Sequence, residues 1–186
     1  MSAGRLATID DLYRVPDHGK AELVGGRLVV MSPTGDAPSF ASGEIFASLR
    51  EHARRTGVGR AVGDNAGFLV DLPHRQSFSP DAAFHLGPST GAKFFDRAPA
   101  FAVEVRSEDD YGPVAEAQLA RKRADYFSAG TKVVWDVDVL RARVVRAYRA
   151  TDPHAPVIFG RGDIADAEPA VAGWSMPVDD LFLFPS

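Results

Sequence analysis

The chain contains no cysteine, and this absence removes several classes of site at once. Disulfide scaffolds, thiolate zinc sites, cysteine nucleophiles and thiol redox motifs all need that side chain. The sequence also lacks any run near the roughly 18 consecutive apolar residues of a membrane span. Its first residues lack the apolar stretch of a secretory signal. We therefore expect a cytoplasmic protein that does not associate with a membrane.

Positive charge is scarce as well. The 186 residues include 21 basic and 25 acidic side chains, which gives a net charge of −4. This balance argues against a protein that coats nucleic acid through bulk positive charge, although a local basic groove is still compatible with it. The only lysines are Lys20, Lys93, Lys122 and Lys132. With so few lysines, one that lies near candidate catalytic residues is less easily explained as a chance result of the amino-acid composition.

Several common chemical motifs are missing. The segment 87–93 contains glycines and a lysine, but their spacing is wrong for a phosphate-binding loop. No dinucleotide-binding glycine pattern follows an expected strand, and the five histidines never form the His-Glu-x-x-His pattern of zinc hydrolases. The sequence therefore gives no support for a nucleotide-cofactor enzyme or for a histidine-based metal site.

The length and the ordinary composition, with 45% hydrophobic and 25% charged residues, predict a single domain over residues 1–186. The pattern predicts an N-terminal β-hairpin around Gly25-Gly26 and an α/β fold with a mixed central sheet flanked by helices. The helices are expected at 8–13, 39–56 and 113–129, and the strands at 21–24, 27–31, 67–72, 81–86, 99–105, 132–137, 143–149 and 157–159.

One acidic residue stands inside the most apolar expected strand. Glu104 follows Phe101-Ala102-Val103, and a carboxylate buried there needs a partner, because burying an isolated charge costs several kcal/mol. Asp81 opens another expected strand 104 − 81 = 23 residues earlier, which is enough for a neighbouring strand. Two carboxylates on adjacent strands can hold one hard divalent cation through oxygen ligands.

Lys122 lies on the flank of the apolar stripe of the expected helix 113–129, which should face the sheet. From there its amine could reach over the strand end toward Glu104. It could then orient a water molecule or offset negative charge during phosphoryl transfer.

These residues, in this order, resemble a known family. Pro80-Asp81, then Glu104 in Val-Glu-Val-Arg-Ser, then Lys122-x-x-x-Tyr126-x-x-x-Gly130 before Val134-Trp135-Asp136-Val137 are similar to the Uma-type restriction endonucleases of the PD-(D/E)xK nuclease superfamily. The opening 22–33 and the closing 173–182 resemble that family too, so the likeness covers nearly the whole chain.

The resemblance implies a restriction-endonuclease-like fold and a hydrolase that cleaves DNA phosphodiester bonds with Mg²⁺ or Mn²⁺, often as a homodimer. It assigns Asp81 and Glu104 as metal ligands, Lys122 as the catalytic lysine on the helix, and Glu22 as a further catalytic acidic residue.

The sequence departs from the family pattern at two positions. Arg106 stands two residues after the glutamate, where lysine is usual, and arginine cannot act as a base. The stretch 36–40 lacks the histidine that family members tend to carry. An alternative is therefore a weakened or inactive nuclease fold that serves as a binding or assembly module; a hydrolase of other phosphate esters is a third possibility.

Each candidate residue also has a purely structural interpretation. Asp81 could cap a turn, and Glu104 could pair with Arg123 or with Arg106 of a second copy. Lys122 could be a solvated helix lysine, and Glu22 an exposed hairpin residue.

Overall fold

The computed structural model describes residues 5–15 and 19–183. Its elements are α1 (Ile9–Leu12), β1 (Ala21–Val24), β2 (Arg27–Val30), α2 (Asp36–Thr56), β3 (Arg60–Val62), β4 (Phe68–Leu72), β5 (Arg75–Phe78), β6 (Ala82–His85), β7 (Phe101–Val105), α3 (Pro113–Ser128), β8 (Val133–Asp138), β9 (Val144–Arg149), β10 (Asp152–Phe159), β11 (Ile164–Asp166), β12 (Ser175–Pro177) and the 3₁₀ helix η2 (Val178–Leu181).

A six-stranded sheet in the order β10-β9-β8-β7-β6-β3 forms the centre of the molecule. Its strands pair antiparallel except β7 and β8, which are parallel and joined through α3. A second sheet, in the order β2-β1-β5-β4, begins with the expected N-terminal hairpin. Gly25 and Gly26 both have positive φ, as a tight primed turn requires. The mixed α/β architecture with a central sheet and flanking helices is as the sequence predicts.

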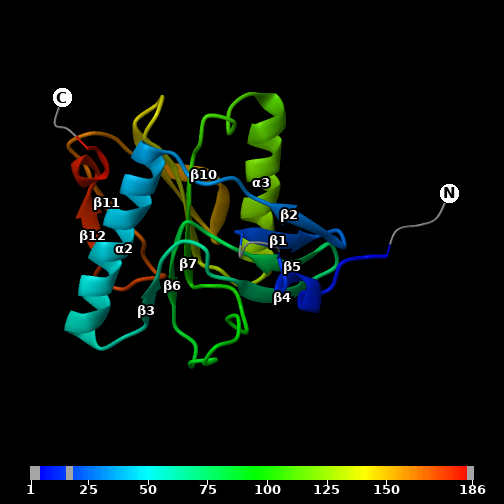
Figure 1. The fold of residues 1–186 in the computed structure, drawn as a ribbon. Coiled ribbons are helices and arrows are strands. Elements are labelled where there is room, and N and C mark those ends of the chain that lie inside the picture. Colours follow the sequence, from blue (N-terminus) through cyan, green and yellow to red (C-terminus); the bar gives the residue numbers. More distant parts are fainter. Residues whose placement is uncertain (1–4, 16–18, 184–186) are drawn as a thin grey trace.

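Helix α2 covers one face of the central sheet and α3 covers the other (Figure 1). On the α2 face, Ile45 and Leu49 belong to the same buried cluster as Phe101, Val103 and Trp135. Because side chains alternate along a strand, the odd-numbered residues of β7 and β8 face α2 and the even-numbered ones face α3. Glu104, like Ala102, therefore faces the α3 side.

The α3 face is smaller and is shared with the second sheet. Tyr126 of α3 stacks on Phe78 of β5 with a centroid separation of 3.9 Å, and both belong to a cluster with Phe68 and Val134. This packing holds the N-terminal hairpin sheet beside α3 (Figure 1). The elements that carry the candidate residues thus meet on one side of the central sheet.

Most expected elements occur within one to three residues of the expected limits. Helix α2 begins at Asp36 rather than Ser39, because Pro38 is tolerated in the first helical turn. Strand β10 runs from Asp152 and is longer than expected, and the short strands β3, β5 and β11 were not expected. Within the described residues, no helix is long and apolar enough to cross a membrane.

Candidate active site

The pairing of β6 with β7 brings the two predicted metal ligands together. Ala82 lies opposite Val103, and extending this register by one residue places Asp81 opposite Glu104. The Asp81 backbone N–H donates to the carbonyl of Val103, at 3.0 Å, and so fixes the start of β6. Both side chains therefore leave the same end of the sheet toward α3.

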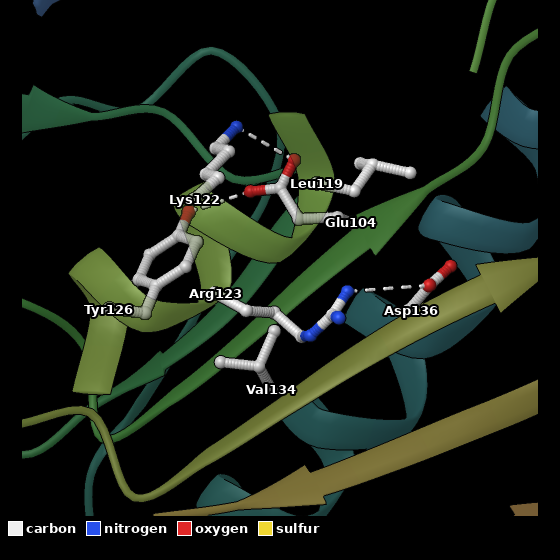
Figure 2. Close-up of a pocket in the computed structure, with 7 residues that line it drawn as sticks. All are labelled: Glu104, Leu119, Lys122, Arg123, Tyr126, Val134 and Asp136. Atoms are coloured by element: carbon white, nitrogen blue, oxygen red, sulfur yellow. Dashed lines mark hydrogen bonds and ion pairs between the residues drawn. The ribbon is translucent and has the colours of Figure 1, made fainter. Parts of the chain in front are cut away.

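Glu104 is held from α3 through both of its oxygens (Figure 2). The Lys122 amine donates to Oε2 at 2.8 Å, and the Tyr126 hydroxyl donates to Oε1 at 2.7 Å. Lys122 and Tyr126 are four residues apart, one helical turn, so both reach the same carboxylate. The predicted placement of Lys122 beside Glu104 is confirmed, and the solvated-lysine interpretation is wrong.

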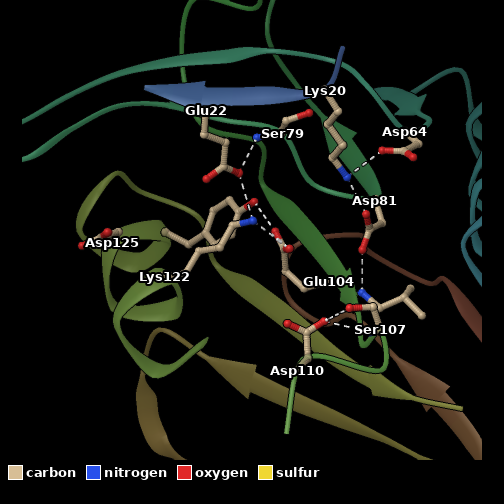
Figure 3. Close-up of polar contacts among 12 residues, drawn as sticks. Lys20, Glu22, Asp64, Ser79, Asp81, Glu104, Ser107, Asp110, Lys122 and Asp125 are labelled. Atoms are coloured by element: carbon tan, nitrogen blue, oxygen red, sulfur yellow. Dashed lines mark hydrogen bonds and ion pairs between the residues drawn. The ribbon is translucent and has the colours of Figure 1, made fainter. Parts of the chain in front are cut away.

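Glu22 joins the same cluster from β1 (Figure 3). Its Oε1 lies 2.9 Å from the Lys122 amine and also accepts from the backbone N–H of Ser79, while Oε2 lies 2.5 Å from Arg75. The residue is only 4% exposed, which contradicts the interpretation as an exposed hairpin residue. Lys122 thus bridges the carboxylates of Glu22 and Glu104.

Asp81 contacts a different lysine. Its Oδ2 accepts from the backbone N–H of Val105 at 2.7 Å, and its Oδ1 lies 2.5 Å from the amine of Lys20. The same amine lies 2.7 Å from Asp64. Figure 3 shows Asp81 and Glu104 as neighbouring carboxylates, each with its own lysine.

A second layer of charge supports Glu22. The Arg75 guanidinium donates to Glu22 and also to Asp125 of α3, at 2.8 Å, and His74 contacts the other oxygen of Asp125. Arg75 and Asp125 are buried, so this bridge ties β5 to α3. It fixes the distance between the hairpin sheet and the helix that carries Lys122.

The surroundings shift the protonation of the central groups. Burial raises the pKa of Glu104 to about 7, an effect that Lys122 opposes and Asp81 and Glu22 reinforce. Burial alone would lower the pKa of Lys122, but Glu104 and Glu22 raise it, and the net pKa lies above its usual value. Burial and Glu104 also raise the pKa of Tyr126. At neutral pH, Lys122 is therefore a cation and Tyr126 a hydroxyl donor.

Glu22 and Lys20 follow the same pattern of opposed effects. Burial raises the pKa of Glu22, yet Lys122 and Arg75 lower it below its usual value. Burial lowers the pKa of Lys20, yet Asp81, Glu104 and Asp64 raise it above its usual value. Glu22 and Lys20 thus stay charged at neutral pH. The raised pKa of Glu104 lets this carboxylate take up a proton near neutral pH.

The charges of this cluster suit one divalent cation. The ion pairs join five carboxylates, those of Glu22, Asp64, Asp81, Glu104 and Asp125, to three cations, Lys20, Lys122 and Arg75, which leaves two negative charges in excess when all are ionised and histidine is counted as neutral. Oxygen donors of this kind fit Mg²⁺ or Mn²⁺. Among the described residues, no three His, Cys, Asp or Glu side chains form a ready metal cage.

Arg106 takes no part in the cluster. Its guanidinium donates to both oxygens of Asp136, at 2.6 and 2.7 Å, and also contacts Glu116. Asp136 lies opposite Glu104 on β8, and Arg123 is within 3.7 Å of it (Figure 2). The arginine two residues after Glu104 is therefore committed to a buried ion pair.

No motif in the sequence indicates a role for Lys20, Arg75 or Asp64. The only available signal was the scarcity of lysine, since two of the four lysines, Lys20 and Lys122, lie in this cluster. Tyr126 packs on Phe78 and also donates to Glu104.

Comparison with known proteins identifies the family and the fold of the chain. The model of the Uma2 family, described as "Putative restriction endonuclease", matches residues 7–179. A solved structure described as "a putative nuclease belonging to DUF820", from Anabaena variabilis ATCC 29413, superposes with a TM-score of 0.74. The two chains share 16% identity, and the alignment covers 94% of this chain and 97% of the other, so the likeness shows a common fold. No curated protein matches the chain.

Proposed function

The chain belongs to the Uma2 family, and from this premise we propose that it is a metal-dependent nuclease that hydrolyses phosphodiester bonds of DNA. The observation that carries the proposal is the convergence of Asp81, Glu104 and Lys122 at one end of the central sheet. Residues from three separate elements meet there, and the fold buries charged groups to bring them together.

Asp81 and Glu104 are the groups that would hold the divalent ion, which supplies Lewis acidity toward a phosphate oxygen. Lys122 contributes a fixed positive charge beside Glu104. Because its pKa is raised, Lys122 serves to orient the phosphate and offset its developing charge, and a protonated amine does not act as a base. Tyr126 and Glu22 keep Glu104 and Lys122 in position.

The test is cleavage of supercoiled plasmid and of single-stranded DNA in Mg²⁺ or Mn²⁺. We expect Asp81→Asn, Glu104→Gln and Lys122→Met each to lower the rate at least about 100-fold, the scale typical of removing one group that stabilises a transition state. The exposed residues Asp152, Glu51 and Lys132 provide matched controls, as Asp152→Asn, Glu51→Gln and Lys132→Met. Cleavage that persists in all three site variants would reject the site assignment.

The binding-module alternative predicts a different result in the same assay. Arg106 occupies the position of the usual lysine and is held by Asp136, which would favour that alternative if a lysine at that position were indispensable. Absence of cleavage by the wild type, together with no heat of Mn²⁺ binding in calorimetry, would support the non-catalytic function.

We also propose that the active form is a homodimer, because cutting both strands of a duplex favours two sites related by a twofold axis. Light scattering should then give twice the mass of one chain. A mass of one chain at assay concentration would contradict this part of the proposal.

A further inference from the structure

Lys20 lies immediately before β1 and contacts two carboxylates from different loops (Figure 3). Its amine is 2.5 Å from Oδ1 of Asp81 and 2.7 Å from Oδ1 of Asp64. The side chain of Lys20 is 12% exposed and that of Asp64 is 41% exposed. The amine therefore stands between an inner carboxylate of the cluster and an outer one at the surface.

The inner contact competes with a metal ion. Oδ2 of Asp81 already accepts from the backbone N–H of Val105, so Oδ1 is the oxygen directed to other ligands. An ammonium group at 2.5 Å from Oδ1 and a divalent cation bound to that same oxygen would repel each other at close range. A metal ion that binds at Oδ1 of Asp81 therefore competes with the amine for this oxygen.

Asp64 can serve as the ion-pair partner of the Lys20 amine when the amine leaves Asp81. Its carboxylate contacts Lys20 already, and it stands on the solvent side of the cluster. Lysine suits such an exchange, because its ammonium is a compact charge on a flexible stem, whereas arginine is tied to a planar geometry.

We propose that Lys20 is an exchangeable counter-ion of Asp81, which leaves for Asp64 when a divalent ion binds. This inference rests on the proposed metal-dependent function, because it concerns the same carboxylate. Lys20 is then a positioning residue: it pairs with Asp81 and holds it in place while the site holds no metal, and it sets the metal affinity by competition.

The test is calorimetric titration of the full chain with Mn²⁺ in the absence of DNA. We expect Lys20→Met to bind Mn²⁺ about fivefold or more tightly than the wild type, the lower end of typical couplings between two binding events. We expect Asp64→Asn to bind it more weakly, because Lys20 then has only Asp81 as a partner. Lys132→Met removes an exposed lysine elsewhere and should leave the affinity unchanged.

A double variant separates exchange from simple charge effects. If Asp64 acts by receiving Lys20, then Asp64→Asn has no effect on affinity in the Lys20→Met background; a general electrostatic effect of Asp64 would persist there. Damage to the fold would lower the affinity of Lys20→Met, so a gain cannot arise from that cause.

The outcomes distinguish this inference from the proposed function. Equal Mn²⁺ affinity in the wild type and Lys20→Met, or a persistent effect of Asp64→Asn in the double variant, would overturn the exchange and leave the metal site intact. No Mn²⁺ binding by either the wild type or Lys20→Met would overturn both.

Discussion

At Glu104, a carboxylate stands in an otherwise apolar strand, and its neighbours explain how the fold tolerates it. The cost of burying such a group predicts a partner from the sequence alone. The structure identifies two partners in α3, Lys122 and Tyr126, while Arg123 contacts Asp136 instead. The prediction of a partner was thus correct, because it depends on burial, which an apolar run reveals.

The raised pKa of Glu104 links stability to pH. A carboxyl whose pKa is about 7 in the folded protein, against 4.5 ordinarily, contributes stability that is complete below about pH 4.5 and is lost as the pH rises through 7. We expect Glu104→Gln, which cannot ionise, to remove this loss. Relative to the wild type, the variant should gain on the order of 2 kcal/mol of unfolding free energy between pH 5 and pH 8.

Urea unfolding of both proteins with EDTA at pH 5 and pH 8 measures that gain. Glu51→Gln, an exposed substitution of the same type on α2, should show the pH dependence of the wild type. A constant difference between Glu104→Gln and the wild type at the two pH values would mean that Glu104 keeps an ordinary pKa.

The hydroxyl of Tyr126 gives a second prediction for a single residue. Tyr126→Phe keeps the ring that stacks on Phe78 but removes the donor to Glu104. We expect a loss of about 1–2 kcal/mol in unfolding free energy, because a buried acceptor loses its donor. Denaturant unfolding measures the loss, with Tyr148→Phe, another largely buried tyrosine, as a control that should change stability little. Equal losses of unfolding free energy in the two variants would show that the hydrogen bond from Tyr126 to Glu104 adds no particular stability.

Among the elements, the β7–α3–β8 unit was predictable almost to the residue. Its strands are apolar runs, and α3 begins at Pro113 and is followed by Gly130 at positive φ, which are reliable helix limits. Strands β3 and β5 could not be predicted, because Arg60–Val62 is very short and Arg75–Phe78 has three polar residues before its single apolar one. Their pairing with β6 and β1 forms only through tertiary structure.

The candidate site likewise contains residues that the sequence pattern predicts and residues that it does not. Asp81 and Glu104 were predictable as neighbours because Glu104 lies in a recognisable strand and Asp81 directly precedes another. Lys20 and Asp64 lie outside regular elements, and 61 residues separate Lys20 from Asp81, so no periodicity relates them. Arg75 lies in a strand that was itself missed. Partners contributed by loops and short polar strands become visible only once the chain is folded.

Arg106, at the end of β7, permits a test of the family pattern. Arg106→Lys would restore the glutamate-x-lysine spacing with Glu104, yet the side chain at this position is directed to Asp136 and Glu116. We expect no gain in cleavage rate and a loss of about 1–3 kcal/mol in stability, because lysine cannot replace the two-point contact with Asp136. Plasmid cleavage and denaturant unfolding measure the two effects. A faster enzyme would show that the position reaches the catalytic centre.

Over the whole molecule, charge opposes the proposed substrate. The net charge is −4, and the candidate site itself holds more carboxylates than ammonium groups. A polyanion therefore meets unfavourable electrostatics at the site until a divalent ion neutralises the excess negative charge. On the proposed function, the metal ion would offset the negative charge that this acidic protein presents to a nucleic acid.

It follows that DNA affinity should depend on the metal. We expect Lys122→Met, which retains both proposed metal ligands but lacks the catalytic cation, to bind a fluorescent DNA duplex about tenfold more tightly in Mg²⁺ than in EDTA, since about 1.4 kcal/mol of relieved repulsion suffices. Fluorescence anisotropy at constant ionic strength measures this. Asp81→Asn in the Lys122→Met background should lose the enhancement, because the ion then lacks a ligand. If that double variant keeps the full effect, Mg²⁺ acts by general screening of the DNA, and the local charge balance does not govern binding.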